Sequence, residues 1–277
     1  MDMRPIGIFD SGLGGLTTAK KLIEFLPEED IIYLGDTGRV PYGSRSRETI
    51  IKYACQDAAF LAGYDIKAMV IACNTVCSTA YEALNSAYDM PVYEVVSAPA
   101  KAAAALTENR KIGVIGTAAT IGSGAYETAL YEIMPDAYVL SIPCPLFVPL
   151  VENGRTSDKD AAALTIAGDY LFPMLRAGVD TLIMGCTHYP LLRGVISKVM
   201  GPGVTLVDSG VETAKFAAND LAERKLLARN RAETNAVRAD NGVVRYFVTD
   251  GIDGFQLIAS RYMESDVTGR VEQISLE

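Results

Sequence analysis

Hydrophobic positions in the first hundred residues follow two alternating patterns. Short apolar runs, typical of strands buried in a parallel sheet, alternate with stretches whose apolar residues recur every three or four positions, typical of amphipathic helices. Leu16, Ala19, Ile23 and Leu26 show the helical spacing. The pattern predicts strands at 6–9, 31–34, 68–72 and 92–96, a helix at 16–26, and a helix through Ala80, Ala83 and Leu84.

A second series of the same kind starts near Lys111. After its third strand, Leu192, Val195, Ile196 and Val199 lie on one face of a helix. Alternating strands and helices are typical of an α/β fold with mostly parallel sheets. The pattern predicts strands at 112–115, 138–142, 181–184, 204–207 and 245–249, helices at 158–175, 192–199, 211–227 and 254–263, and an exposed loop or helix end at 228–241.

The two series can be aligned on each other. Ile-Gly-Ile-Phe-Asp-Ser at 6–11 matches Ile-Gly-Val-Ile-Gly-Thr at 112–117. Val-Ile-Ala-Cys-Asn-Thr at 70–75 matches Leu-Ile-Met-Gly-Cys-Thr at 182–187, with one extra residue before the second cysteine. Each half starts with a strand that contains glycine and reaches a cysteine at the end of a later strand. We therefore expect two related α/β domains.

Composition narrows the classes of function. The chain has 277 residues, 49% of them hydrophobic, and a net charge of −9, which disfavours a general nucleic-acid or anionic-membrane binder. It has one histidine, His188, which excludes a His-rich metal site. Its five cysteines are irregularly spaced, unlike a disulfide framework, and no signal peptide or membrane-spanning run is present, so we expect a cytoplasmic protein with free thiols.

Cys73 and Cys186 each follow an apolar strand directly and precede a predicted helix. Ligands of open parallel sheets bind outside the carboxyl ends of the strands. A helix N-terminus there favours the thiolate, so we expect each pKa to lie below the usual value of about 8.5. Core packing explains one such cysteine well. Two in matching positions, beside Asn74, Thr75 and Thr187, indicate function.

Four chemistries use these thiols differently. A single nucleophile with His188 as its base, as in a cysteine hydrolase, leaves the second cysteine without a role, and the two side chains diverge if the segment is extended. Zinc held by Cys73, Cys77, Cys186 and His188 has loose ligand spacing, so no metal is expected. A redox dithiol lacks a Cys-x-x-Cys motif. A racemase uses both thiols equally, one on each face of a stereocentre, and no lysine motif for pyridoxal phosphate stands out, so no cofactor is expected.

Two loops add polar groups and glycines near the strand ends. Asp10 and Ser11 end the first strand, and Gly12, Gly14 and Gly15 then allow the backbone to approach a ligand carboxylate closely. The spacing is not GxGxxG and no Walker lysine follows, which disfavours nucleotides. Gly35-Asp36 and Pro41-Tyr42-Gly43 form a second loop made of turn residues.

Taken together, these motifs resemble those of the glutamate racemases in the aspartate/glutamate racemase superfamily, over nearly the whole chain. The second cysteine motif is the most specific match, because aspartate-type relatives typically carry an acid where His188 stands. The matching segments are Phe9-Asp10-Ser11-Gly12-Leu13-Gly14-Gly15, Gly35-Asp36, Pro41-Tyr42-Gly43, Ala72-Cys73-Asn74-Thr75, Gly116-Thr117 with Thr120, Ser123 and Tyr126, Pro149-Leu150-Val151-Glu152 with Gly154, and Gly185-Cys186-Thr187-His188-Tyr189-Pro190.

The resemblance implies a cofactor-independent interconversion of L- and D-glutamate that supplies D-glutamate for peptidoglycan. It implies that Cys73 and Cys186 are the acid/base thiols, that Asp10 assists Cys73, and that Glu152 and His188 assist Cys186. Racemisation of a related amino acid such as aspartate, or a hydrolase using His188, is the alternative. The substrate-binding residues that the resemblance implies are Asp10, Ser11, Pro41, Tyr42, Gly43, Asn74, Thr75, Thr117, Thr120 and Thr187.

The resemblance also implies an architecture. Two pseudo-symmetric α/β domains, residues 1–97 plus 210–277 and residues 98–209, would face each other across the active-site cleft. Relatives are often dimeric, so a homodimer fits. No extension precedes the first strand, and such an extension accompanies regulation by a peptidoglycan precursor in the family, so that regulation is not expected. Of the remaining thiols, Cys55, Cys77 and Cys144 are expected only to pack.

Overall fold

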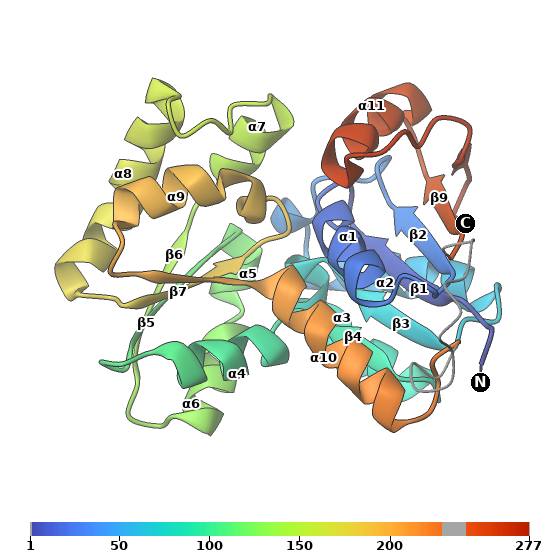
Figure 1. The fold of residues 1–277 in the computed structure, drawn as a ribbon, viewed down its shortest axis with the longest axis horizontal. Helices are drawn as coiled ribbons and strands as arrows, with labels where there is room; N and C mark the ends of the chain where they lie inside the picture. Colours follow the sequence, from blue (N-terminus) through green and yellow to red (C-terminus); the bar gives the residue numbers. More distant parts are fainter. Residues whose placement is uncertain (1, 229–241, 277) are drawn as a thin grey trace, which may run out of the picture.

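The computed structural model describes residues 2–228 and 242–276, whose strands form two separate parallel sheets (Figure 1). The first sheet has the order β10-β9-β2-β1-β3-β4 and the second the order β6-β5-β7-β8. The α/β fold is thereby confirmed. The strands are β1 (Ile6–Asp10), β2 (Ile31–Gly35), β3 (Ala68–Ile71), β4 (Val92–Glu94), β5 (Lys111–Gly116), β6 (Tyr138–Pro143), β7 (Thr181–Gly185), β8 (Thr205–Asp208), β9 (Val244–Val248) and β10 (Val271–Gln273).

Helices cover both faces of each sheet. In the first sheet, α1, α10 and α11 pack on one face and α2 and α3 on the other; in the second, α8 and α9 lie opposite α4 and α6. The helical elements are α1 (Leu16–Phe25), η1 (Tyr42–Ser44), α2 (Arg47–Ala62), α3 (Asn74–Ala87), α4 (Ser97–Leu106), α5 (Ala118–Gly122), α6 (Ala125–Ile133), α7 (Phe147–Glu152), α8 (Ala161–Ala177), η2 (Tyr189–Leu192), α9 (Arg193–Met200), α10 (Ser209–Glu223) and α11 (Ile252–Met263).

The four strands from β1 to β4 and the four from β5 to β8 have the same spatial order. The order β2-β1-β3-β4 in the first sheet corresponds to β6-β5-β7-β8 in the second. Gly7 of β1 pairs with Met69, and Gly113 of β5 pairs with Leu182. Both glycines lie against buried side chains, because a Cβ would lie 2.7 Å from Ile66 Cδ1 at Gly7 and 2.9 Å from Leu182 Cδ1 at Gly113.

The chain crosses between the sheets twice, after β4 and after β8. The two crossings lie together, since Thr213 Oγ1 of α10 donates to the carbonyl of Glu94 at 3.2 Å. Asp208 caps α10 by accepting from the backbone N–H groups of Gly210 and Val211. The crossings suit the domains proposed above, residues 1–97 plus 210–277 and residues 98–209, whose boundaries stay a prediction.

Two further sequence expectations concern exposed or membrane-spanning segments. Of the stretch 228–241, expected to be exposed, Ala228 is buried and donates its N–H to Glu29 Oε1 at 2.8 Å, while 229–241 lie outside the described residues. Across the described parts of the chain, none of the helices combines the length and the apolar character needed to span a membrane.

Candidate active site

Cys73 and Cys186 occupy equivalent positions after equivalent strands. Cys73 lies four residues after Met69, the partner of Gly7, and Cys186 lies four residues after Leu182, the partner of Gly113. The extra residue in the sequence alignment above is therefore wrong: Ala72 corresponds to Gly185. The strand register aligns β3 with β7 without a gap up to the cysteines.

On the first-sheet side, the Cys73 thiol lies beside the loop that follows β1. Its Sγ donates to Ser11 Oγ at 3.3 Å, and only 5% of Cys73 is exposed. Asp10 is fully buried at the end of β1, where its Oδ2 accepts from the N–H of Gly12 at 3.0 Å and its Oδ1 has no partner. A buried carboxylate oxygen without a partner is costly, so this atom is available to a ligand.

The protonation state of Cys73 differs from the expectation for a helix N-terminus. Cys73 is the N-cap of α3, as expected, but burial and the nearby charge of Asp10 raise the pKa of its thiol to about 12. The expected lowering is wrong for Cys73, because burial and a negative neighbour outweigh the helix N-terminus. Without substrate, Cys73 is protonated at neutral pH.

A chain of hydroxyls joins the two sheets next to Cys73. Thr75 Oγ1 lies 3.1 Å from Thr117 Oγ1, which lies 3.0 Å from Thr120 Oγ1. Thr117 also caps α5 by accepting from the N–H of Thr120. Asn74 donates its Nδ2 to Tyr126 Oη at 3.1 Å, and its buried Oδ1 has no partner. These side chains come from both sheets, so they line the space between them.

On the second-sheet side, Cys186 and His188 lie beside each other. The chain bends after β7, so His188 contacts the thiol two positions earlier, contrary to the divergence expected of an extended segment. His188 Nε2 lies 3.4 Å from Glu152 Oε1, an ion-pair distance without hydrogen-bond alignment. Burial lowers the pKa of His188, but its side-chain interactions with Cys186 and Glu152 and the charge of Asp10 outweigh burial and raise this pKa to about 10.

Gly14 and Gly15 allow the loop after β1 to pack closely against its neighbours, and they do not leave open space for a ligand. A Cβ on Gly14 would lie 2.1 Å from Thr187 Oγ1 and 2.5 Å from His188 Nδ1, and a Cβ on Gly15 would lie 2.5 Å from the Asp10 Cβ. Thr17 adds a direct link, since its Oγ1 lies 2.9 Å from the carbonyl of Thr187. The loop after β1 thus packs directly on the second cysteine motif.

The second loop contributes its backbone rather than the Tyr42 hydroxyl. Tyr42 is buried and its hydroxyl hydrogen-bonds with Asp36 and Asp57, while Pro41 is exposed. A Cβ on Gly43 would lie 3.5 Å from the Thr117 Cβ, which places this turn beside the hydroxyl chain. Asp57 was not singled out from the sequence, although a carboxylate on the buried face of α2 could have indicated it.

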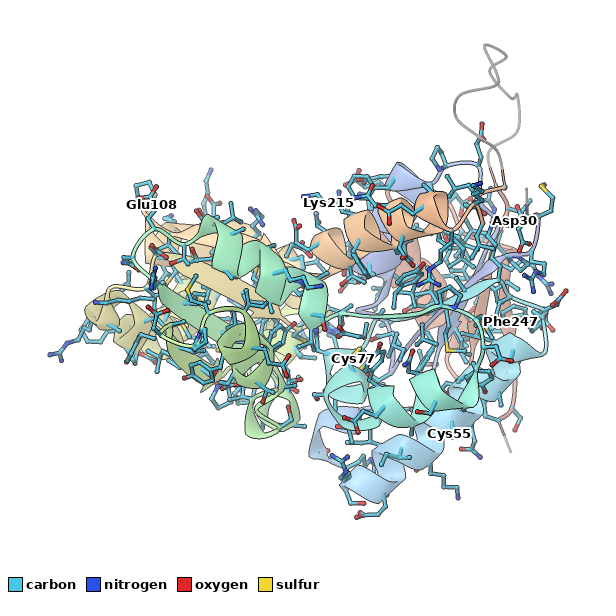
Figure 2. All side chains as sticks on the ribbon, turned by 90° about the horizontal axis from the view of Figure 1, so that it is seen from below. Asp30, Cys55, Cys77, Glu108, Lys215 and Phe247 are labelled. Atoms are coloured by element: carbon cyan, nitrogen blue, oxygen red, sulfur yellow. The ribbon has the colours of Figure 1, made fainter. Side chains whose placement is uncertain are left out.

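The three other cysteines differ in exposure. Cys77 and Cys144 are buried, and Cys77 Sγ donates to the carbonyl of Ile71 at 3.1 Å. Cys55 is exposed on α2, so the expectation that it packs in the core is wrong; Figure 2 labels Cys55 and Cys77. Position 55 is on the solvent side because the buried face of α2 runs through Ala54, Ala58 and Leu61.

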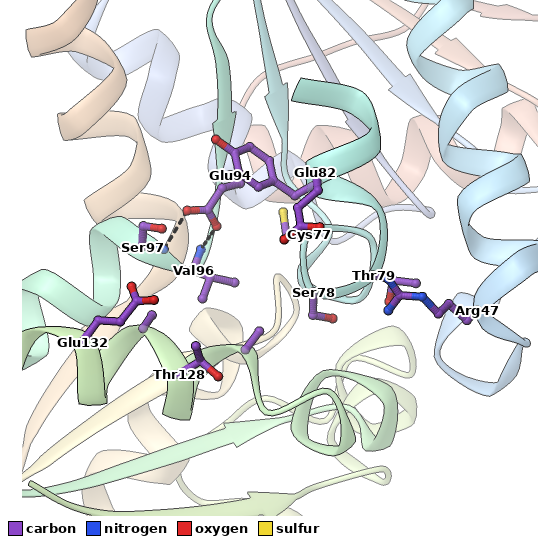
Figure 3. Close-up of a pocket in the computed structure, with 13 residues that line it drawn as sticks. Arg47, Cys77, Ser78, Thr79, Glu82, Glu94, Val96, Ser97, Thr128 and Glu132 are labelled. Carbon is purple, nitrogen blue, oxygen red and sulfur yellow. Dashed lines mark hydrogen bonds between the residues drawn. The ribbon is translucent and has the colours of Figure 1, made fainter. Parts of the chain in front are cut away.

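A separate cavity of about 320 Å³ lies on the other side of α3 and contains none of the predicted site residues (Figure 3). It is lined by Cys77, Glu82, Glu94 and side chains of α4 and α6. Glu94 does not point freely into it, since its carboxylate accepts from the N–H groups of Val96 and Ser97. Nowhere in the described ranges do three or more His, Cys, Asp or Glu side chains gather as a metal site.

Comparison with known proteins gives the class. The family model for Asp/Glu/Hydantoin racemases matches residues 20–217. A glutamate racemase of Geobacter metallireducens is 47% identical over all 277 residues and 98% of its own length. The chain therefore belongs to the Asp/Glu/Hydantoin racemase family, and it is an isomerase.

Solved structures point to one group within that family. A glutamate racemase isoform of Bacillus anthracis superimposes with a TM-score of 0.92 at 38% identity, covering 100% of this chain and 99% of that one. The glutamate racemase of Francisella tularensis, solved in complex with D-glutamate, gives 0.89 at 37% identity with the same coverage. The chain is thus similar to glutamate racemases over its full length, which confirms the resemblance inferred from its motifs.

Proposed function

We propose that this chain interconverts L- and D-glutamate with two thiols, Cys73 and Cys186, and without a cofactor. The observation that carries the proposal is the equivalence of these two cysteines, each 5% exposed and each directly after the matching strand of its sheet. Two bases on opposite faces of one α-carbon require such an arrangement. The complex of the Francisella relative with D-glutamate supports glutamate as the substrate.

The surrounding atoms suit an amino acid. Asp10 Oδ1 and Asn74 Oδ1 are buried acceptors without partners, which an α-ammonium group with three N–H donors would satisfy. The hydroxyls of Thr75, Thr117 and Thr120 can rotate to donate to a carboxylate. We therefore assign substrate binding to these residues, to Ser11 and Thr187, and to the backbone of Pro41, Tyr42 and Gly43.

The proposed reaction moves one proton off the α-carbon and another onto it. In one direction, the Cys186 thiolate takes the α-proton and becomes a thiol, leaving a carbanion at the α-carbon. The Cys73 thiol then gives its proton to the opposite face and becomes a thiolate. The reverse direction exchanges the two roles. Preorganised donors around the carboxylate stabilise the carbanion.

We also propose three further properties of this enzyme. The D-glutamate would serve peptidoglycan synthesis, and the protein would act in the cytoplasm. A homodimer is also proposed, and light scattering of the purified chain measures it directly.

The test replaces each thiol separately. Cys73→Ala and Cys186→Ala should each reduce racemisation of glutamate by more than about 10³-fold, since each removes one proton carrier. Cys77→Ala is the matched control, because Cys77 is a buried thiol on the same helix as Cys73 that lies outside the proposed site. Circular dichroism checks the fold of all three variants.

An assay in deuterated water tests the two-base step. L-Glutamate should yield D-glutamate that carries solvent deuterium at the α-carbon. Near wild-type activity in either Cys73→Ala or Cys186→Ala, or product that retains the hydrogen of the substrate, would contradict the mechanism. Parallel assays with aspartate and other amino acids decide the substrate.

A further inference from the structure

A buried polar cluster lies beneath the second loop. Tyr42 Oη lies 3.0 Å from Asp57 Oδ2 and also donates to Asp36 Oδ2. Arg39 joins the same two carboxyl groups, with its Nε 2.5 Å from Asp36 Oδ2 and its Nη2 2.8 Å from Asp57 Oδ1. Asp36 and Asp57 are completely buried. We call Asp36, Arg39, Tyr42 and Asp57 the loop cluster.

Further groups complete the surroundings of the loop cluster. Thr249 Oγ1 donates to Asp36 Oδ1 at 2.8 Å, and Gln56 Oε1 accepts from Arg39 Nη1 at 2.6 Å. The Arg39 guanidinium also stacks on the Tyr53 ring, 4.2 Å from its centroid. The polar partners of the cluster therefore come from the ends of β2 and β9 and from α2.

The hydrogen bonds around the Tyr42 hydroxyl require either Asp36 or Asp57 to be neutral. The Tyr42 hydroxyl has one hydrogen, yet both carboxyl groups lie at hydrogen-bonding distance from its oxygen. One of these contacts therefore needs a proton on the carboxyl. Burial, then the charge of Asp36, raise the pKa of Asp57 well above its usual range, although Arg39 opposes them. Asp57 is the neutral acid: it donates to Tyr42, which donates to Asp36.

The loop cluster connects the site residues on two sides. The N–H of Asp36 donates to the carbonyl of Asp10 at 3.0 Å, beside the proposed ammonium site. Tyr42 begins the single turn of η1, whose Gly43 lies against Thr117. The turn is three residues long and has no side-chain cap, and the Tyr42 hydroxyl joins it to Asp36 and Asp57.

We propose that Asp57 and Arg39 are positioning residues, which fix the Pro41–Tyr42–Gly43 backbone for binding glutamate through a neutral Asp57 carboxyl that donates to Tyr42. This inference rests on the proposed function, because it assigns these residues to binding of the same substrate. Neither side chain touches the substrate in this scheme. Their effect appears in KM, since the thiols that set the chemical step lie elsewhere.

Substitutions at Asp57 test whether its carboxyl group is neutral or ionised. Asp57→Asn keeps an oxygen for Arg39 and offers an N–H to Tyr42, so KM should stay within about twofold of wild type. Asp57→Ala and Arg39→Gln leave polar groups unpaired, so the turn loosens and KM should rise about tenfold. In both, kcat should change less than about threefold. The measurements are steady-state kinetics in both directions and the melting temperature.

The matched control is the other buried ion pair of the first sheet. Lys67 Nζ lies 2.5 Å from Glu29 Oε2, both side chains are buried, and the pair lies at the amino ends of the strands, away from the cysteines. Glu29→Gln should lower the melting temperature and leave KM unchanged. This variant measures the effect on stability and KM of losing a buried charge that has only a structural role.

The outcomes are distinct. An unchanged KM in Asp57→Ala and Arg39→Gln, with only a lower melting temperature, overturns the positioning role. If Asp57→Ala does not fold, Arg39→Gln and Asp57→Asn carry the test. A tenfold higher KM in Asp57→Asn overturns the neutral acid, because an anion is then required. Wild-type protein that does not racemise glutamate contradicts the proposed function instead.

Discussion

The two thiols lie in matching positions but in opposite electrostatic surroundings. The ionisable group beside Cys73 is the buried carboxyl of Asp10, and the pKa of the thiol rises to about 12. Beside Cys186 is His188, whose own pKa rises to about 10, so it carries a positive charge at neutral pH. The duplicated fold supplies symmetric positions, while the neighbouring residues place opposite charges beside the two thiols.

This difference assigns the resting protons. Burial and the charge of Asp10 keep the proton on Cys73, whereas Cys186 has the His188 imidazolium beside it. Asp10 and His188 also interact, since each charge affects the pKa of the other group. In the proposed mechanism, the protonated Cys73 is the acid that one direction of racemisation needs. Three measurements test whether the two sides differ in this way.

The largest effect is expected for His188→Asn. Removing the positive charge beside Cys186 leaves that thiol without stabilisation of its thiolate, so kcat/KM for glutamate should fall about 10²–10³-fold. Steady-state kinetics in both directions measure it. A loss of less than about threefold would mean that His188 does not support Cys186, and the contrast between the two sides would fail.

A smaller effect is expected in the alkylation rates of the two thiols. Because only the thiolate reacts, iodoacetamide at pH 8 should modify Cys186 at least about tenfold faster than Cys73. The exposed Cys55 would react too, so the experiment uses a Cys55→Ser background with peptide mass spectrometry. Both thiols are equally buried, so equal rates would show that they share one resting state.

A third effect is expected in the pH dependence of stability. His188 has a pKa of about 10 in the folded chain and about 6.5 when unfolded. Its protonation therefore stabilises the fold fully below pH 6.5, and this contribution is lost as pH rises to about 10. Between pH 7 and 9, wild type should lose about 1.4 kcal/mol per pH unit more than His188→Asn. Urea unfolding measures this, and parallel curves for the two proteins would refute the raised pKa.

Most strands of both sheets could be predicted from the sequence, because buried parallel strands are continuous apolar runs. Short or mixed elements were missed. The buried face of α2 carries Asp57 among its apolar residues, and α7 has only six residues, so neither shows a helical apolar stripe. β10 has one half-buried residue, Val271, between exposed ones, which leaves no strand pattern to detect.

In the candidate site, Cys73 and Cys186 could be identified because each directly follows a matching apolar strand. The other site residues came from the resemblance of the motifs to those of the glutamate racemases. Relations between residues far apart in the chain could not be predicted. The pKa of Cys73 depends on how deeply the fold buries it, and the need for glycine at position 14 depends on Thr187 and His188, more than 170 residues away. Such effects follow from packing, which no local pattern encodes.

The two chain crossings have a mechanical consequence. Both lie together at Glu94 and Thr213, so the covalent connections between the sheets lie at one edge. Non-covalent contacts at Gly14, Thr17, Asn74 and Thr75 also link the two halves near the cysteines. Separating the sheets thus bends two short backbone segments and breaks a few weak bonds. The stiffness of the molecule against opening is set by those bonds, and single substitutions there should tune how fast substrate enters and product leaves.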